Sequence, residues 1–75
     1  MAKIIIYSKV NCMQCNFTKK YLEDKKVDFE VRDVEKSNEA LEEVKALGFQ
    51  SLPVVVAEGF EAFSGFRPDM LDKII

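Results

Sequence analysis

Residues 3–15 read KIIIYSKVNCMQC, an apolar run followed by a short polar segment and two cysteines that are three positions apart. The β-branched run from Lys3 to Ser8 is typical of a buried strand. Asn11 is a favourable N-cap, so we expect a helix to follow it and to continue to about Lys25. Both cysteines then lie in the first turn of this helix, at the carboxyl end of the first strand. In open α/β sheets, ligands and chemistry are usually found at that end.

The rest of the chain continues the alternation of strands and helices. Apolar periodicity, caps and turns predict five more elements: a strand at 27–34, a helix after Ser37 that ends at Gly48, a strand at 53–57, a strand at 60–63 and a helix that begins at Pro68. The first β-α-β unit should be parallel and right-handed, and the last two strands should form an antiparallel hairpin. We therefore predict an α/β fold of order β-α-β-α-β-β-α, with three helices around a four-stranded mixed sheet, in a single domain that covers residues 1–75.

The apolar positions of these elements predict the core. One apolar face of the first helix comprises Met13, Phe17, Tyr21 and Leu22. The inward positions of the two later helices are Leu41, Val44, Leu47, Leu71, Ile74 and Ile75. Four phenylalanines are expected to be buried: Phe17, Phe29, Phe60 and Phe63. Phe49 and Phe66 are expected instead to form an apolar collar around the thiols, where they would help to dock a protein partner.

Composition excludes several classes of function. The 75 residues are 48% hydrophobic with a net charge of −2, which suits one small domain and gives no general affinity for nucleic acid. With no histidine and only two cysteines, the chain cannot be a Ser-His-Asp or Cys-His hydrolase, and it lacks the usual ligands of a mononuclear zinc site. Its longest apolar runs are far shorter than the ~20 residues of a membrane span. A secretory signal pattern is also absent, so the cytoplasm is the expected compartment.

The spacing of Cys12 and Cys15 indicates redox chemistry. Residues i and i+3 share one face of a first helical turn, close enough for a disulfide. Unpaired backbone N–H groups and the helix dipole stabilise a thiolate on the first cysteine, and Lys9 adds positive charge. Residues 1–26 carry six lysines and two acids, whereas residues 27–75 carry five bases and eleven acids. We expect Cys12 to attack and Cys15 to resolve. There are two alternative interpretations of these cysteines: they are small buried apolar residues, or they form half of a metal site that two chains share.

Pro53 is a second indication of function. It begins an apparent strand, where a proline costs a ladder hydrogen bond. It is either a simple strand-entry proline or a cis proline. In the second case it would leave the backbone of Leu52 free to pair with an extended substrate strand.

These features together resemble the thioredoxin-fold redoxins, and most closely the NrdH-type redoxins. The resemblance covers essentially the whole chain and is carried by four segments: Tyr7–Lys9, Cys12–Cys15, Gly48–Val55 and Ser64–Asp69. The Ser-Gly-Phe-Arg-Pro sequence that starts at Ser64 separates this group from ordinary glutaredoxins. Two positions depart from the family pattern. Phe63 stands where the family usually has Trp, and Met13-Gln14 stands where it usually has Val-Gln.

The resemblance implies a thioredoxin/glutaredoxin-like fold, a cis Pro53 and no bound cofactor beyond the Cys12–Cys15 dithiol or disulfide. It implies that thioredoxin reductase donates the electrons and that the large subunit of class Ib ribonucleotide reductase accepts them, with the redoxin acting as a monomer. Nine residues are expected to contact substrate or partner proteins: Lys9, Met13, Gln14, Leu52, Pro53, Ser64, Gly65, Phe66 and Arg67.

Two other functions remain open. The first is a glutathione-dependent glutaredoxin, in which Lys9 and the backbone of Leu52-Pro53 would bind glutathione. However, Gln14 replaces the usual aromatic residue, and Gly65-Phe66-Arg67 replaces the usual small, acidic turn. In a dimeric iron–sulfur cluster carrier, two chains would supply four thiolates. Some glutaredoxins bind such a cluster together with glutathione, so the poor glutathione site of this chain argues against a cluster carrier.

Overall fold

Four strands form one mixed sheet, in the order β2-β1-β3-β4. The computed structural model describes residues 3–75, and its strands are β1 (Ile4–Ser8), β2 (Glu30–Asp33), β3 (Val54–Ala57) and β4 (Phe63–Ser64). β1 is parallel to β2 and antiparallel to β3, and β3 is antiparallel to β4. The two most apolar strands, β1 and β3, are therefore the central ones. The predicted order of elements and the predicted mixed sheet are both confirmed.

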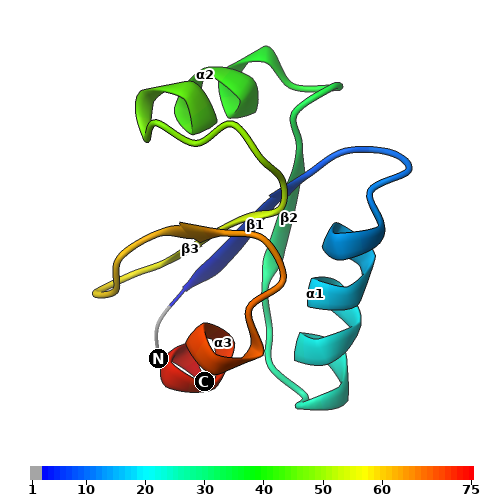
Figure 1. The fold of residues 1–75 in the computed structure, drawn as a ribbon, viewed down its shortest axis with the longest axis vertical. Coiled ribbons are helices and arrows are strands. Elements are labelled where there is room, and N and C mark those ends of the chain that lie inside the picture. Colours follow the sequence, from blue (N-terminus) through cyan, green and yellow to red (C-terminus); the bar gives the residue numbers. More distant parts are fainter. Residues whose placement is uncertain (1–2) are drawn as a thin grey trace.

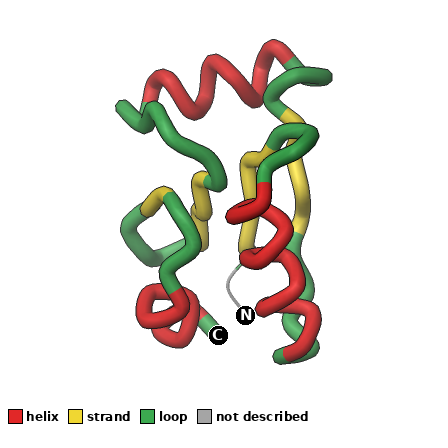
Figure 2. Tube along the Cα trace, turned by 45° about the vertical axis from the view of Figure 1, so that its right-hand side comes forward, coloured by secondary structure: helices red, strands yellow, loops and turns green. Residues whose placement is uncertain are grey.

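Three helices cover the two faces of this sheet (Figures 1 and 2). They are α1 (Met13–Asp24), α2 (Asn38–Ala46) and α3 (Pro68–Ile74). Leu22 of α1 and Leu71 of α3 share one core cluster with Ile4 and Ile6 of β1. Val44 of α2 belongs to a second cluster, together with Tyr7 and Val54. Because β1 contributes to both clusters, it is buried on both faces, which explains why its sequence is apolar without alternation.

Two strands are shorter than the sequence predicts. β2 begins at Glu30 rather than at residue 27, and Val27 and Phe29 pack against the first core cluster before the strand starts. β4 begins at Phe63 rather than at residue 60, because a tight turn follows β3 and the N–H of Phe60 donates to the carbonyl of Ala57 at 3.0 Å. Phe63 is buried as expected. Phe60 is 48% exposed, so its prediction as a core residue is wrong.

The inward face of α1 also differs from the prediction. The buried residues are Cys15, Thr18 and Leu22, whereas Met13 is 71% exposed and Phe17 is 50% exposed. The helix offers two apolar stripes, and the sheet covers the one that contains the second cysteine. In α2 and α3 the predicted Val44, Leu71 and Ile74 are buried, while Leu47 and Ile75, at the C-terminal ends, are exposed.

A polar cluster fastens α2 to the sheet. The hydroxyl of Tyr7 donates to Glu43 at 2.5 Å, and Arg32 donates to the same carboxylate at 2.8 Å and to Glu30 at 2.6 Å. Burial and then the bond to Glu43 raise the pKa of Tyr7, and the bond from Arg32 lowers the pKa of Glu30. The Tyr7 hydroxyl therefore stays protonated and the Glu30 carboxylate stays ionised through neutral pH.

Two helices end with the same backbone turn, a Schellman motif. In α1, the N–H groups of Lys26 and Val27 donate to the carbonyls of Glu23 and Leu22 at 2.9 and 3.0 Å. In α2 the equivalent donors are Gly48 and Phe49, at 3.0 and 3.3 Å. The residue after each C-cap has a left-handed conformation, with φ of 58° at Lys26 and 85° at Gly48. Gly48 fits the motif without strain, whereas Lys26 does not.

This pair of turns allows a matched test of stability. Lys26→Gly should raise the free energy of unfolding by about 1 kcal/mol, and Gly48→Ala should lower it by about the same amount. Urea denaturation of the two variants beside the parent chain measures both changes. A loss of stability in Lys26→Gly would contradict the assigned conformation of α1's last turn.

Candidate functional site

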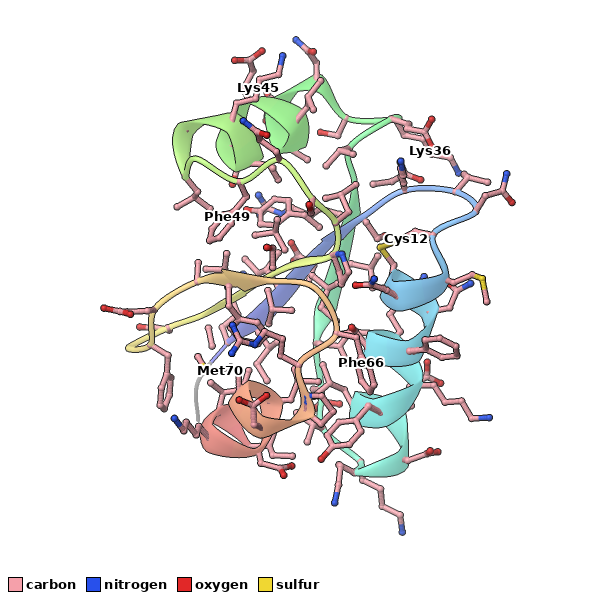
Figure 3. All side chains as sticks on the ribbon, in the orientation of Figure 1. Cys12, Lys36, Lys45, Phe49, Phe66 and Met70 are labelled. Carbon is pink, nitrogen blue, oxygen red and sulfur yellow. A yellow bond between two sulfur atoms is a disulfide. The ribbon has the colours of Figure 1, made fainter. Side chains whose placement is uncertain are left out.

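Cys12 and Cys15 form a disulfide at the start of α1, with their Cα atoms 5.2 Å apart (Figure 3). Cys12 is 8% exposed, whereas Cys15 is fully buried beneath the first turn. The two sulfur atoms are therefore not equivalent, because a partner that approaches from solvent meets Cys12 first.

The N-cap of α1 is Cys12, so the prediction of Asn11 as the N-cap is wrong. Asn11 has a left-handed conformation with φ of 63°, which asparagine tolerates better than most residues. Cys12 is extended and is itself the N-cap, and its Sγ accepts a hydrogen bond from the N–H of Cys15 at 3.2 Å. The N–H of Cys15, in the first turn of the helix, thus points toward the Cys12 sulfur. After reduction, this environment stabilises negative charge on that sulfur.

The sheet brings two other loops to the same end of the molecule. Val54, the first residue of β3, pairs both with Tyr7 near the end of β1 and with Ser64 at the end of β4. Pro53 therefore lies beside the end of β1, from which the chain leads to Cys12. The Leu52–Pro53 peptide bond is cis, as the resemblance implied.

Hydrogen bonds connect the loop after β4 to both neighbours. The N–H of Gly65 donates to the carbonyl of Pro53 at 2.8 Å, and the N–H of Phe66 donates to Oε1 of Gln14 at 3.3 Å. Gly65 has φ of 85°, a conformation that side chains rarely adopt. A residue between the two cysteines is thus bonded directly to the Ser64–Arg67 segment, and that segment is bonded to the cis proline.

Aromatic contacts fix the same loop against α1. The ring of Phe66 lies 6.0 Å, centroid to centroid, from the rings of Phe17 and Tyr21. Figure 3 shows Phe66 beside the helix, below the end that bears Cys12. The hydroxyl of Tyr21 also donates to Asp72 of α3, and this bond, ahead of burial, raises the pKa of Tyr21.

The structure distributes the other predicted partner-binding residues unevenly. Lys9 and Met13 are exposed near the disulfide, and Arg67 is exposed with its guanidinium 3.8 Å from the Asp69 carboxylate. Leu52 is half-buried and packs against the α2 core cluster. Phe49 packs against that cluster too, so it is not part of a collar around the thiols.

Three exposed apolar residues lie near the disulfide, and of these only Met13 is among the predicted partner-binding residues. Val10 precedes the motif, and Met13 and Phe17 follow Cys12 on the outer face of α1; all three are exposed. For Met13 and Phe17, the signal that could have found them is Cys15. With Cys15, Thr18 and Leu22 on the buried face of the helix, the stripe of Met13 and Phe17 faces outward.

The residues that the structure describes, 3–75, include no cluster of three or more His, Cys, Asp or Glu side chains able to hold a metal ion. None of the helices in this range is long and apolar enough to span a membrane. What the site does hold is a pair of sulfur atoms in unequal environments. That arrangement suits the exchange of a disulfide for a dithiol.

The bond from Phe66 to Gln14 can be tested alone. In Gln14→Ala, the Phe66 amide loses its acceptor, so its hydrogen exchange should accelerate, at a cost of up to about 1 kcal/mol in stability. Asn16→Ala, an exposed position on the same helix, is the matched control and should leave Phe66 unchanged. Equal exchange rates at Phe66 in both variants would show that Gln14 does not hold the loop.

Comparisons with known proteins agree with this geometry. A family model described as Glutaredoxin matches residues 4–60. The glutaredoxin-like protein NrdH of Escherichia coli K12 is 44% identical over 72 residues, which are 96% of this chain and 88% of that protein. The NrdH protein of Lactococcus lactis IL1403 is 41% identical over 71 residues, 95% of this chain and 97% of that protein.

Solved structures show the same relationship. The structure of the E. coli NrdH-redoxin, described as the basis of its thioredoxin-like activity profile, matches with a TM-score of 0.92 at 42% identity and covers 97% of this chain and 95% of its own. A glutaredoxin from Archaeoglobus fulgidus matches with a TM-score of 0.81 at 31% identity, over 99% of this chain and 86% of its own.

Proposed function

Because the chain belongs to the glutaredoxin family, and within it to the NrdH-type redoxins, we propose that it carries electrons from thioredoxin reductase to a protein disulfide. We propose that the main acceptor is the disulfide of class Ib ribonucleotide reductase. The Cys12–Cys15 pair makes it a thiol–disulfide oxidoreductase. We propose further that it acts as a single-domain monomer in the cytoplasm, without a bound cofactor.

The observation on which the proposal rests is the bonded Ser64–Arg67 loop. Glutathione-dependent glutaredoxins typically have an aromatic residue inside the motif and a small turn followed by an acid at the last helix. Here Gln14 and the Phe66 amide bond to each other, and the Phe66 ring packs on α1. The cation of Arg67 follows directly. The thioredoxin-like profile stated for the E. coli relative supports the same preference in this chain.

The reaction consists of two exchanges. The Cys12 thiolate attacks one sulfur of the target disulfide, forms a mixed disulfide and releases the other target sulfur as a thiolate. Cys15 then loses its proton, attacks Sγ of Cys12 and releases the second target thiolate. Two electrons pass to the target, and the Cys12–Cys15 disulfide is regenerated. The reductase returns two electrons and restores the dithiol.

The unequal exposure of the two sulfurs supports these proposed roles, and the roles predict opposite effects of two variants. Cys15→Ser keeps the attacking sulfur and lacks the resolving one, so it should accumulate a mixed disulfide with a protein substrate. Cys12→Ser should form no adduct, since the remaining sulfur is buried. Non-reducing electrophoresis with mass spectrometry distinguishes the two. Adducts from Cys12→Ser alone would reverse the assignment.

The electron donor is tested by NADPH oxidation at 340 nm with a disulfide substrate. Thioredoxin reductase alone should support turnover, whereas glutathione with glutathione reductase should support little or none. If turnover required glutathione, the bonded loop would not exclude the tripeptide, and the protein would be a glutathione-dependent glutaredoxin. The Gln14→Ala variant extends this test, because releasing the loop should increase whatever glutathione-dependent rate the parent has.

A further inference from the structure

Met13 stands inside the redox motif, at a position where the NrdH-type redoxins usually have Val. It is the first residue of α1 and directly follows Cys12. Its side chain is 71% exposed, the largest fraction among the exposed large apolar residues of the described range, 3–75. Valine has no atom that a peroxide attacks, whereas methionine carries a thioether sulfur that is oxidised to a sulfoxide. Met13 therefore adds an oxidisable sulfur atom to the surface beside the disulfide.

In the disulfide form of the protein, Met13 carries the exposed reduced sulfur. Residues 3–75 contain no free cysteine, because Cys12 and Cys15 are bonded to each other. The other methionine in this range, Met70, is partly buried and packs against the first core cluster. Figure 3 shows Met70 beside α3, away from Cys12. Since an oxidant must reach the sulfur atom, we expect Met13 to react before Met70.

Met13 also lies where a target protein must make contact. Cys12 is only 8% exposed, so a target sulfur reaches it only if the surface of the target closes on the residues around it. Val10, just before the motif, and Met13 are exposed there, as is Phe17 one turn further along α1. Covering the apolar Met13 side chain favours this approach, because apolar surface is removed from water. A sulfoxide at the same position is polar, and its oxygen would have to lose water.

We propose that Met13 is an oxidation site: hydrogen peroxide converts it to the sulfoxide in the disulfide form, and the sulfoxide slows thiol–disulfide exchange with protein targets. The thioether sulfur attacks one oxygen of the peroxide, an S–O bond forms, the O–O bond breaks, and the second oxygen leaves as water. The sulfur loses two electrons and the peroxide gains them. The cysteines take no part, so their own chemistry is retained. The effect on exchange rests on the proposed transfer of electrons to a protein disulfide.

The first test measures the oxidation itself. The full chain in its disulfide form is treated with millimolar hydrogen peroxide, and peptide mapping by mass spectrometry follows each methionine. Met13 should be oxidised at least about fivefold faster than Met70, with the Cys12–Cys15 disulfide intact. Equal rates at the two methionines, or loss of the disulfide before Met13 reacts, would overturn the proposal. This result does not depend on any partner or activity of the protein.

The second test compares two substrates before and after treatment, with dithiothreitol as the electron source and the peroxide removed by catalase. The oxidised protein should reduce the disulfides of insulin at least about threefold more slowly, because part of the apolar contact is lost. Its reduction of 2-hydroxyethyl disulfide, which covers little surface, should be unchanged. Equal losses with both substrates would show damage to the thiol chemistry and overturn the proposal. If the untreated protein reduced no insulin, the proposed electron transfer would fail, and with it the effect on exchange, whereas the mapping result would stand.

Two variants identify the methionine that is responsible. Met13→Val has the usual residue of the NrdH-type redoxins, and peroxide should leave its rate of insulin reduction, whatever that rate is, unchanged. Met70→Leu is the matched control, and peroxide should slow it as much as the parent, because it retains Met13. Methionine sulfoxide reductases should return the oxidised parent to its original rate. A Met13→Val variant as sensitive to peroxide as the parent would assign the loss to another residue and overturn the proposal.

Discussion

The whole site depends on the residue at which α1 begins. Because Cys12 is the N-cap, its sulfur accepts the N–H of Cys15 and lies at the positive end of the helix, while Cys15 is carried one turn inward and is buried. A start at Asn11 would place both sulfurs differently relative to the sheet. The left-handed conformation of Asn11 prevents that start and turns the chain from β1 into the helix. The position of this N-cap thus gives two chemically identical side chains different environments.

The remaining parts of the site are held relative to that cap by the sheet and by two hydrogen bonds. Antiparallel pairing of β3 with β1 and β4 brings Pro53 and Ser64 to the end where α1 starts. Gly65 then bonds to Pro53, and Phe66 bonds to Gln14. The Ser64–Arg67 loop, on which the proposed preference for thioredoxin reductase rests, is therefore connected to the redox motif itself.

Much of this could be predicted from the sequence, and the failures have physical causes. The order of elements, the cis proline, the cap at Ser37 and the left-handed Gly48 follow from local chemistry and from the family resemblance. The buried face of α1 cannot be predicted in this way, because the helix has two apolar stripes and only the position of the sheet decides which stripe is covered. The prediction of Phe17 as a core residue is wrong for this reason. Likewise, the bond between Gln14 and Phe66 joins residues 52 positions apart, and no local pattern reveals it.

The central claim is that the start of α1 makes Cys12 the reactive sulfur. Limited alkylation of the freshly reduced protein with iodoacetamide near neutral pH, followed by peptide mapping, tests it without any partner protein. The account predicts that the first carbamidomethyl group appears almost entirely on Cys12. First modification of Cys15, or equal modification of both cysteines, would contradict it.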